Sequence, residues 1–178
     1  NLDAVQKAVA ALPWVESVEA SKRWPDTLLL RIYERQPFAR WNDKQLISRQ
    51  GQVFSVPADE LSPDLPSLHG PDDHLAEVVS FYADARKAFA ETHLQITGVT
   101  LTERGSWSLV TADGAQIVLG DREQAGKRLR RFLDVYSKVI AGHDTGFAYA
   151  DLRYTNGFAV RWMPSAAPTP AERGAPRT

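Results

Sequence analysis

The spacing of hydrophobic residues changes character within the first 37 residues of the chain. Apolar side chains first recur at the spacing of one helix face, at Leu2, Val5, Val9 and Leu12. Pro13 ends this pattern, because proline cannot continue a helix beyond its first turn. Two strand-like runs follow at residues 15–22 and 27–35, separated by Trp24-Pro25-Asp26. The pattern therefore predicts a helix and then two strands joined by a tight turn.

Residues 38–55 and 94–119 are predicted to form short strands. The first group has strand-like runs at 38–41, 45–48 and 53–55, with Asn42-Asp43 and Gln50-Gly51 at the turns between them. In the second group we expect a strand over 94–102. The runs 107–111 and 116–119 then flank Asp113-Gly114, a strong hairpin signal. Strands that come in hairpins favour antiparallel pairing.

Two longer helices are predicted around the second group of strands. The first covers about residues 73–91, and its apolar stripe is Leu75, Val78, Val79, Tyr82, Ala85 and Phe89. The second opens at Asp121, which forms a capping pair with Gln124. Its stripe is Ala125, Leu129, Phe132, Leu133, Tyr136, Val139 and Ile140. Residues 57–71 contain four prolines and are predicted to be a loop with little regular structure.

The last structured segment is predicted over residues 147–162, with Asn156-Gly157 as a hairpin turn. Strands at 151–155 and 158–162 are expected to pair across this turn, with Tyr154 opposite Ala159 and Arg153 opposite Val160. The segment also carries Phe158, Arg161 and Trp162, and aromatic residues and arginine are enriched in binding hot spots. Phe158 and Trp162 share a face, and covering a core explains them equally well. The predicted fold class is α+β, a helix and two strands followed by a mostly antiparallel β domain with two helices.

Composition removes several classes of function. The chain has 178 residues, of which 43% are hydrophobic, so a core can form. Its formal net charge is −1, without the basic excess expected of a nucleic-acid binder. It contains no cysteine, which excludes disulfides and thiol chemistry. No apolar run approaches the roughly 20 residues that cross a bilayer. Because Asn1 falls in a helical pattern, we expect a fragment whose natural N-terminus, with any signal or anchor, lies outside this sequence.

The sequence offers no recognisable catalytic motif. Its four histidines are His69, His74, His93 and His143; no two of them lie at i, i+4, and none forms part of a zinc-type motif. No P-loop, G-x-S-x-G or G-x-G-x-x-G motif is present. We therefore expect no enzyme activity, no metal and no cofactor. The basic cluster at 127–131 has two interpretations, either the solvated face of a helix or a docking site for an acidic partner or lipid headgroups.

Several segments, taken in order, resemble a known family. They are LPWVESVEASKRWPDTLLLRIYERQPFARWND (12–43), GQVFSVP (51–57), GSWSLV (105–110), LG (119–120), KRLRRFLDVY (127–136) and AYADLRYTNGFAVRW (148–162). Together they resemble the FtsQ/DivIB cell-division proteins, in the proteobacterial FtsQ form. The resemblance covers nearly all of residues 2–164.

This resemblance implies a domain organisation and a cellular place. Residues 1–37 would be the C-terminal part of a POTRA domain, without its first strand and first helix. Residues 38–164 would be the FtsQ-type β domain, and 165–178 a disordered tail. Such proteins are held in the inner membrane by one helix, which this fragment lacks. These residues would then lie in the periplasm at the division septum.

The resemblance also implies a function. The family is a non-enzymatic divisome scaffold that brings FtsB and FtsL to the septum and helps to control septal peptidoglycan synthesis. FtsB adds a strand to the last strand of the β domain, and POTRA helps to recruit other divisome proteins. The partner-binding residues carried onto this chain are Arg104, Arg153, Tyr154, Gly157, Phe158, Ala159, Val160 and Trp162. The alternatives are a POTRA-containing envelope transport or assembly protein and an enzyme acting on peptidoglycan.

Overall fold

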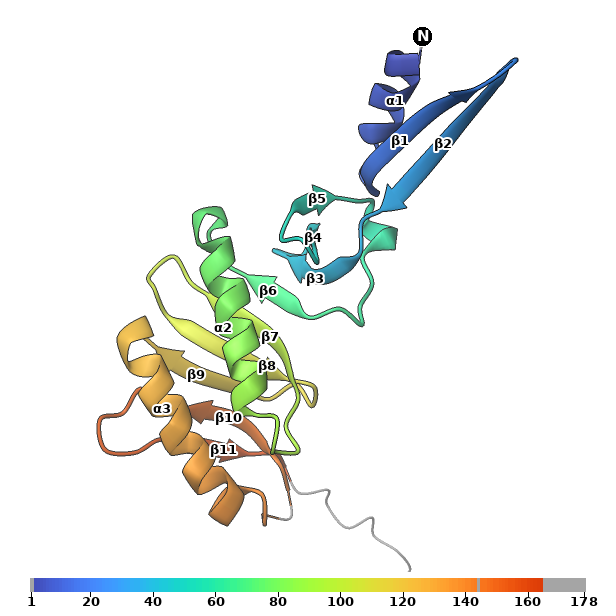
Figure 1. The fold of residues 1–178 in the computed structure, drawn as a ribbon. Helices are drawn as coiled ribbons and strands as arrows, with labels where there is room; N and C mark the ends of the chain where they lie inside the picture. The colour runs from blue at the N-terminus through green and yellow to red at the C-terminus, as the bar shows by residue number, and fades with distance from the viewer. Residues whose placement is uncertain (1, 144, 165–178) are drawn as a thin grey trace, which may run out of the picture.

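The structure is a computed structural model that describes residues 2–143 and 145–164. These residues form a two-stranded and a nine-stranded sheet (Figure 1). The helices and turns are α1 Leu2–Ala10, η1 Ala58–Glu60, η2 Asp72–His74, α2 Leu75–Ala88, α3 Arg122–Val135 and η3 Tyr136–Ile140. The strands are β1 Val15–Arg23, β2 Thr27–Glu34, β3 Pro37–Trp41, β4 Gln45–Ser48, β5 Val53–Ser55, β6 Ser67–His69, β7 Ile96–Leu101, β8 Trp107–Thr111, β9 Gln116–Gly120, β10 Phe147–Asp151 and β11 Ala159–Trp162.

The N-terminal unit has the predicted helix and hairpin. Strands β1 and β2 pair antiparallel along their length, and α1 packs on β1. The side chain of Gln6 on α1 donates to the Val18 carbonyl oxygen at 2.8 Å, which ties the helix to the sheet. Strand β2 is largely exposed, with 42% of Leu28 and 47% of Ile32 accessible. The helix and two strands predicted from the sequence are confirmed.

The larger sheet has the strand order β11-β10-β9-β8-β7-β6-β3-β4-β5 (Figure 1). Three pairs are parallel, namely β3 with β6, β6 with β7, and β9 with β10. The other pairs are antiparallel. The predicted fold class, α+β with a mostly antiparallel sheet, is therefore confirmed.

Residues 57–71 were predicted to be a loop with little regular structure, but the segment contains the turn η1 and the strand β6. It pairs with β3 on one side and β7 on the other, both in parallel. Leu68 at its centre is fully buried. Three residues between prolines are too short to show an alternating pattern. These residues form a strand because β3 and β7 on either side offer backbone hydrogen-bonding groups to them. No local sequence signal indicates these distant partners.

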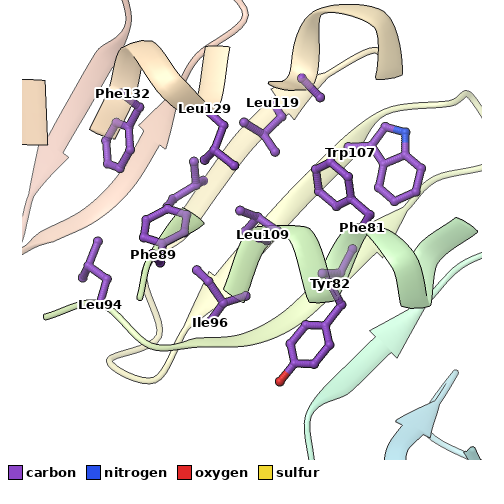
Figure 2. Packing of buried hydrophobic residues seen from close by; sticks show 14 of the residues in the cluster. Phe81, Tyr82, Phe89, Leu94, Ile96, Trp107, Leu109, Leu119, Leu129 and Phe132 are labelled. Carbon is purple, nitrogen blue, oxygen red and sulfur yellow. The ribbon is translucent and has the colours of Figure 1, made fainter. Parts of the chain in front are cut away.

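Helices α2 and α3 lie over one face of the larger sheet and form the core with it (Figures 1 and 2). Figure 2 shows Tyr82 of α2 near Ile96, Phe81 of α2 beside Trp107, and Phe89, the residue after α2, near Leu109. The predicted stripe of α2 omitted Phe81, which is only 4% exposed. In the other helix Val139 was predicted to be buried but is 62% exposed. The chain there widens into a π-helical turn, with Ala141 N–H bonded to the Tyr136 carbonyl, and this turn rotates Val139 outward.

Candidate functional site at the last strand

Strand β11 lies at one end of the larger sheet (Figure 1). Within the described residues it pairs only with β10, with Ala159 opposite Asp151, Val160 opposite Ala150 and Arg161 opposite Tyr149. Just beyond the strand, Met163 N–H bonds the Gly146 carbonyl at 2.8 Å, so position 163 faces β10. Because backbone groups alternate in direction along an antiparallel strand, the N–H groups of Val160 and Trp162 point to the open side.

The predicted two-residue hairpin is wrong. Asp151, not Tyr154, lies opposite Ala159, so the pairing differs by three residues and 152–158 form a connecting loop. This loop is held by Arg131 of α3, whose guanidinium donates to the carbonyls of Tyr154, Thr155 and Gly157 at 2.9 Å. Carbonyls engaged by a side chain are drawn away from a β ladder. The Asn-Gly signal is local and carries no information about this distant arginine.

The two faces of β11 differ in burial. Phe158, Val160 and Trp162 are half-buried and pack against the core. The Phe158 ring meets Phe132 edge-on at 5.5 Å, and the Trp162 ring stacks on His143 at 3.7 Å. These contacts with Phe132 of α3 and with His143 therefore explain a share of the aromatic content here. The side chain of Ala159 is exposed, on the opposite face.

Loop 152–158 presents Tyr154 and Arg153, two of the predicted binding residues, to solvent. Tyr154 is 58% exposed, whereas Gly157 in the same loop is half-buried. The Arg153 side chain is exposed but already has a partner within the chain. Its Nε and Nη2 donate to the buried carboxylate of Asp151 at 2.9 and 2.6 Å. These bonds hold the pKa of Asp151 below its usual range.

Arg104 lies in the turn between β7 and β8 and is exposed. Trp107 at the start of β8 pairs with Gly120 at the end of β9, and β10 runs parallel to β9. The turn that carries Arg104 and the loop after β10 that carries Arg153 therefore lie at the same end of the sheet. At that end the backbone of Gly120 packs close to the Arg153 side chain. The fold thus places Arg104 and Arg153, from two distant segments, at the same end of the sheet, whereas Trp162, opposite Phe147, lies at the other end of β11.

The basic cluster at 127–131 is divided between solvent and the protein interior. Lys127 and Arg130 are exposed, as a solvated helix face requires. Arg128 and Arg131 are half-buried and bond to backbone carbonyls. Neither of the two interpretations of the cluster describes these two arginines. Their spacing of three residues, which puts both on one helix face, is the sequence signal that separates them from their neighbours.

Across residues 2–143 and 145–164, no group of three or more histidine, aspartate or glutamate residues is arranged to hold a metal ion. In that same part of the chain, no helix has the length and apolar character needed to cross a bilayer. The predicted disordered tail, 165–178, lies outside the described residues.

Comparison with known proteins connects this architecture to a family. A family model described as "Cell division protein FtsQ/DivIB, C-terminal" matches residues 39–153, and one described as "POTRA domain, FtsQ-type" matches residues 1–35. The chain is 45% identical over 160 residues to "Cell division protein FtsQ" of Xanthomonas campestris, covering 90% of this chain and 57% of the relative. It is 36% identical over 162 residues to the protein of the same name from Coxiella burnetii, covering 91% and 66%. A third relative, "Cell division protein FtsQ" of Neisseria meningitidis, is 33% identical over 168 residues, covering 94% and 70%. The chain thus spans about six tenths of the length of the first two.

Proposed function

The chain belongs to the FtsQ/DivIB family of cell-division proteins, and on that premise we propose that it is a non-enzymatic divisome scaffold that binds FtsB by strand addition. FtsL accompanies FtsB, and the complex helps to control septal peptidoglycan synthesis. The N-terminal unit, residues 1–37, acts in recruiting other division proteins. A single helix outside this sequence holds the protein in the inner membrane, with these residues in the periplasm at the septum.

One observation supports this proposal above the others, namely the open side of β11 next to an exposed Tyr154. An edge strand offers backbone N–H and carbonyl groups to a second chain. The N–H groups of Val160 and Trp162 are the donors on that side, by the alternation described above. Backbone pairing is tolerant of sequence, so the neighbouring side chains must supply specificity.

The charges near the edge favour an acidic group on the partner. Asp151 occupies Nε and Nη2 of Arg153, so a partner carboxylate would share this guanidinium by way of Nη1. Arg104, exposed at the same end of the sheet, supplies a second cation. Charge-assisted bonds of this kind are shorter and stronger than neutral ones. Tyr154 adds a flat apolar surface with a polar tip.

The first experiment is calorimetric titration of the protein with the periplasmic segment of FtsB. Tyr154→Ala should leave the fold intact and weaken binding by at least ~2 kcal/mol, the scale of a hot spot. Tyr33→Ala is the matched control, because Tyr33 is also exposed, at 42%, but lies on β2. Equal affinities for the two variants would remove Tyr154 from the binding site.

A proline substitution tests the backbone itself. Val160→Pro removes an N–H on the open side and leaves the donors toward β10 in place, so the protein should fold and lose FtsB binding. Ala159→Pro removes an N–H that faces β10, so this variant should lower the melting temperature more than Val160→Pro does. If folded Val160→Pro protein binds FtsB within threefold of the unchanged protein, strand addition at β11 is wrong.

A further inference from the structure

One guanidinium holds most of the loop that precedes β11. Arg131 Nη1 donates to the Thr155 carbonyl, and its Nη2 donates to those of Tyr154 and Gly157, all at 2.9 Å. The Leu152 carbonyl lies 3.5 Å from the same Nη2. Four carbonyls within a span of six residues therefore converge on a single side chain of α3. Two of them belong to residues placed above in the partner-binding site.

We propose that Arg131 is a positioning residue for partner binding, which fixes the shape of loop 152–158 and so presents Tyr154 and the start of β11. This inference rests on the proposed function, since it concerns the same edge. It assigns a role to a residue that lies on another element and does not itself face the partner. The role is to order the loop before the partner arrives.

The physical reason is the entropy cost of ordering a loop that is free before binding. A free loop must lose backbone freedom when a partner binds, and each ordered residue carries an entropy cost. A loop that is already ordered avoids this cost at the moment of binding, and affinity rises accordingly. If only a fraction of the molecules holds the binding-competent loop, the apparent affinity falls by that fraction.

The chemistry of arginine suits this role. Its planar guanidinium offers several donors in fixed directions, whereas the lysine ammonium is a compact point charge. The Nε of Arg131 is buried and has no hydrogen-bond partner within the described residues, so the two terminal nitrogens make the specific contacts. Those contacts all go to the loop. The side chain is thus committed to the loop and not to its own helix.

Arg128, one turn earlier on α3, has a different task. Its Nη1 donates to the Leu119 carbonyl at 2.7 Å and to the Asp121 carboxylate at 3.0 Å. Its contact with the loop is a single longer one, 3.5 Å from Nη2 to the Arg153 carbonyl. Arg128 therefore ties the end of β9 to the start of α3. Of these two arginines, only Arg131 bonds to the middle and the end of the loop.

The experiment compares Arg131→Met with Arg130→Met, since Arg130 is the exposed neighbour on the same helix. Amide hydrogen exchange is measured for residues 153–158 and for β7–β9, and affinity is measured with the FtsB segment. In Arg131→Met the loop amides should exchange at least tenfold faster, with β7–β9 unchanged, and affinity should fall at least tenfold. Arg130→Met should match the unchanged protein in both. Equal loop exchange in the two variants overturns the inference.

Further arms separate a positioning role from general damage and from failure of the proposed function. Arg131→Lys keeps the charge and the stem, so it should stay folded with an intermediate rise in loop exchange. Exchange as slow as in the unchanged protein would overturn the assignment to the guanidinium.

If Arg131 acts through Tyr154, the loss of affinity in the double variant Arg131→Lys/Tyr154→Ala should be smaller than the sum of the two single losses. Additive losses contradict the inference. If the unchanged protein does not bind FtsB, the proposed function fails. The exchange measurement still tests the ordering role in that case, because loop exchange in Arg131→Met as slow as in the unchanged protein would refute it.

Discussion

Gly120 lies where the end of β9 meets the candidate binding corner, and replacing it with alanine tests the packing there. Its φ is +78°, a left-handed conformation that costs an L residue about 1–2 kcal/mol. A Cβ at this position would lie 2.8 Å from Arg128 Nη1 and 3.1 Å from Arg153 Cγ. Both distances are shorter than normal contacts, so the neighbouring side chains must move.

Arg128 is not free to move without loss. The same Nη1 donates to the Leu119 carbonyl and to Asp121, and a hydrogen bond to a charged group contributes about 1.5–3 kcal/mol. Displacing it should weaken at least one of these bonds. With the backbone cost added, Gly120→Ala should lower the free energy of unfolding by about 2.5–5 kcal/mol. Displacement of Arg153 should also weaken FtsB binding.

Gly114→Ala is the matched control. Gly114 has nearly the same φ, +80°, and an added Cβ would meet no atom within 4 Å. This variant should therefore show the backbone cost alone, about 1–2 kcal/mol. Urea denaturation of the two variants, compared at equal m-values, gives the difference directly. If the two losses agree within about 0.5 kcal/mol, the crowding argument at Gly120 is refuted.

Two further predictions concern a charge and a ring. Because Arg153 lowers the pKa of Asp151, their pairing stabilises the fold above the unfolded pKa of about 3.9 and is lost as pH falls through the folded pKa. The stability difference between the unchanged protein and Asp151→Asn, followed by urea denaturation, should therefore shrink below about pH 4, and a difference independent of pH would contradict this. Phe132 is fully buried among four aromatic rings, so Phe132→Ala should cost about 3–5 kcal/mol in the same assay, against less than about 0.5 kcal/mol for the exposed control Val139→Ala. Similar losses for the two variants would contradict the assigned burial.

Elements defined by their own sequence were predictable. Strands β4 and β5 have the bounds expected from their runs and turns. The α3 helix begins where Asp121 predicts, and its carboxylate accepts the Gln124 N–H at 3.0 Å. In each case the deciding interaction lies within a few residues of the signal. Turn residues and caps are local chemistry, so the sequence shows them directly.

The features that could not be predicted depend on distant partners. β6 forms a strand because it can pair with β3 on one side and with β7 on the other. β10 pairs in parallel with β9, and the chain that connects these two strands includes α3. No hairpin signal in the sequence indicates this pairing. The loop before β11 is bonded by Arg131, which lies more than 20 residues away along the chain. Short strands and polar side chains take such roles only when the tertiary structure brings their partners close.

Packing in the core fixes the position of α3, and α3 in turn shapes the candidate binding edge. Phe132 is fully buried and packs on Phe147 of β10 and on Phe158 beside β11, so the helix is fixed relative to both strands. Arg131, the adjacent residue, turns toward loop 152–158 for that reason. The buried face of the helix thus sets where the guanidinium lies, and the guanidinium sets the loop. A core substitution at Phe132 should then reduce binding by disturbing the loop, even though Phe132 has no exposed surface with which to contact a partner.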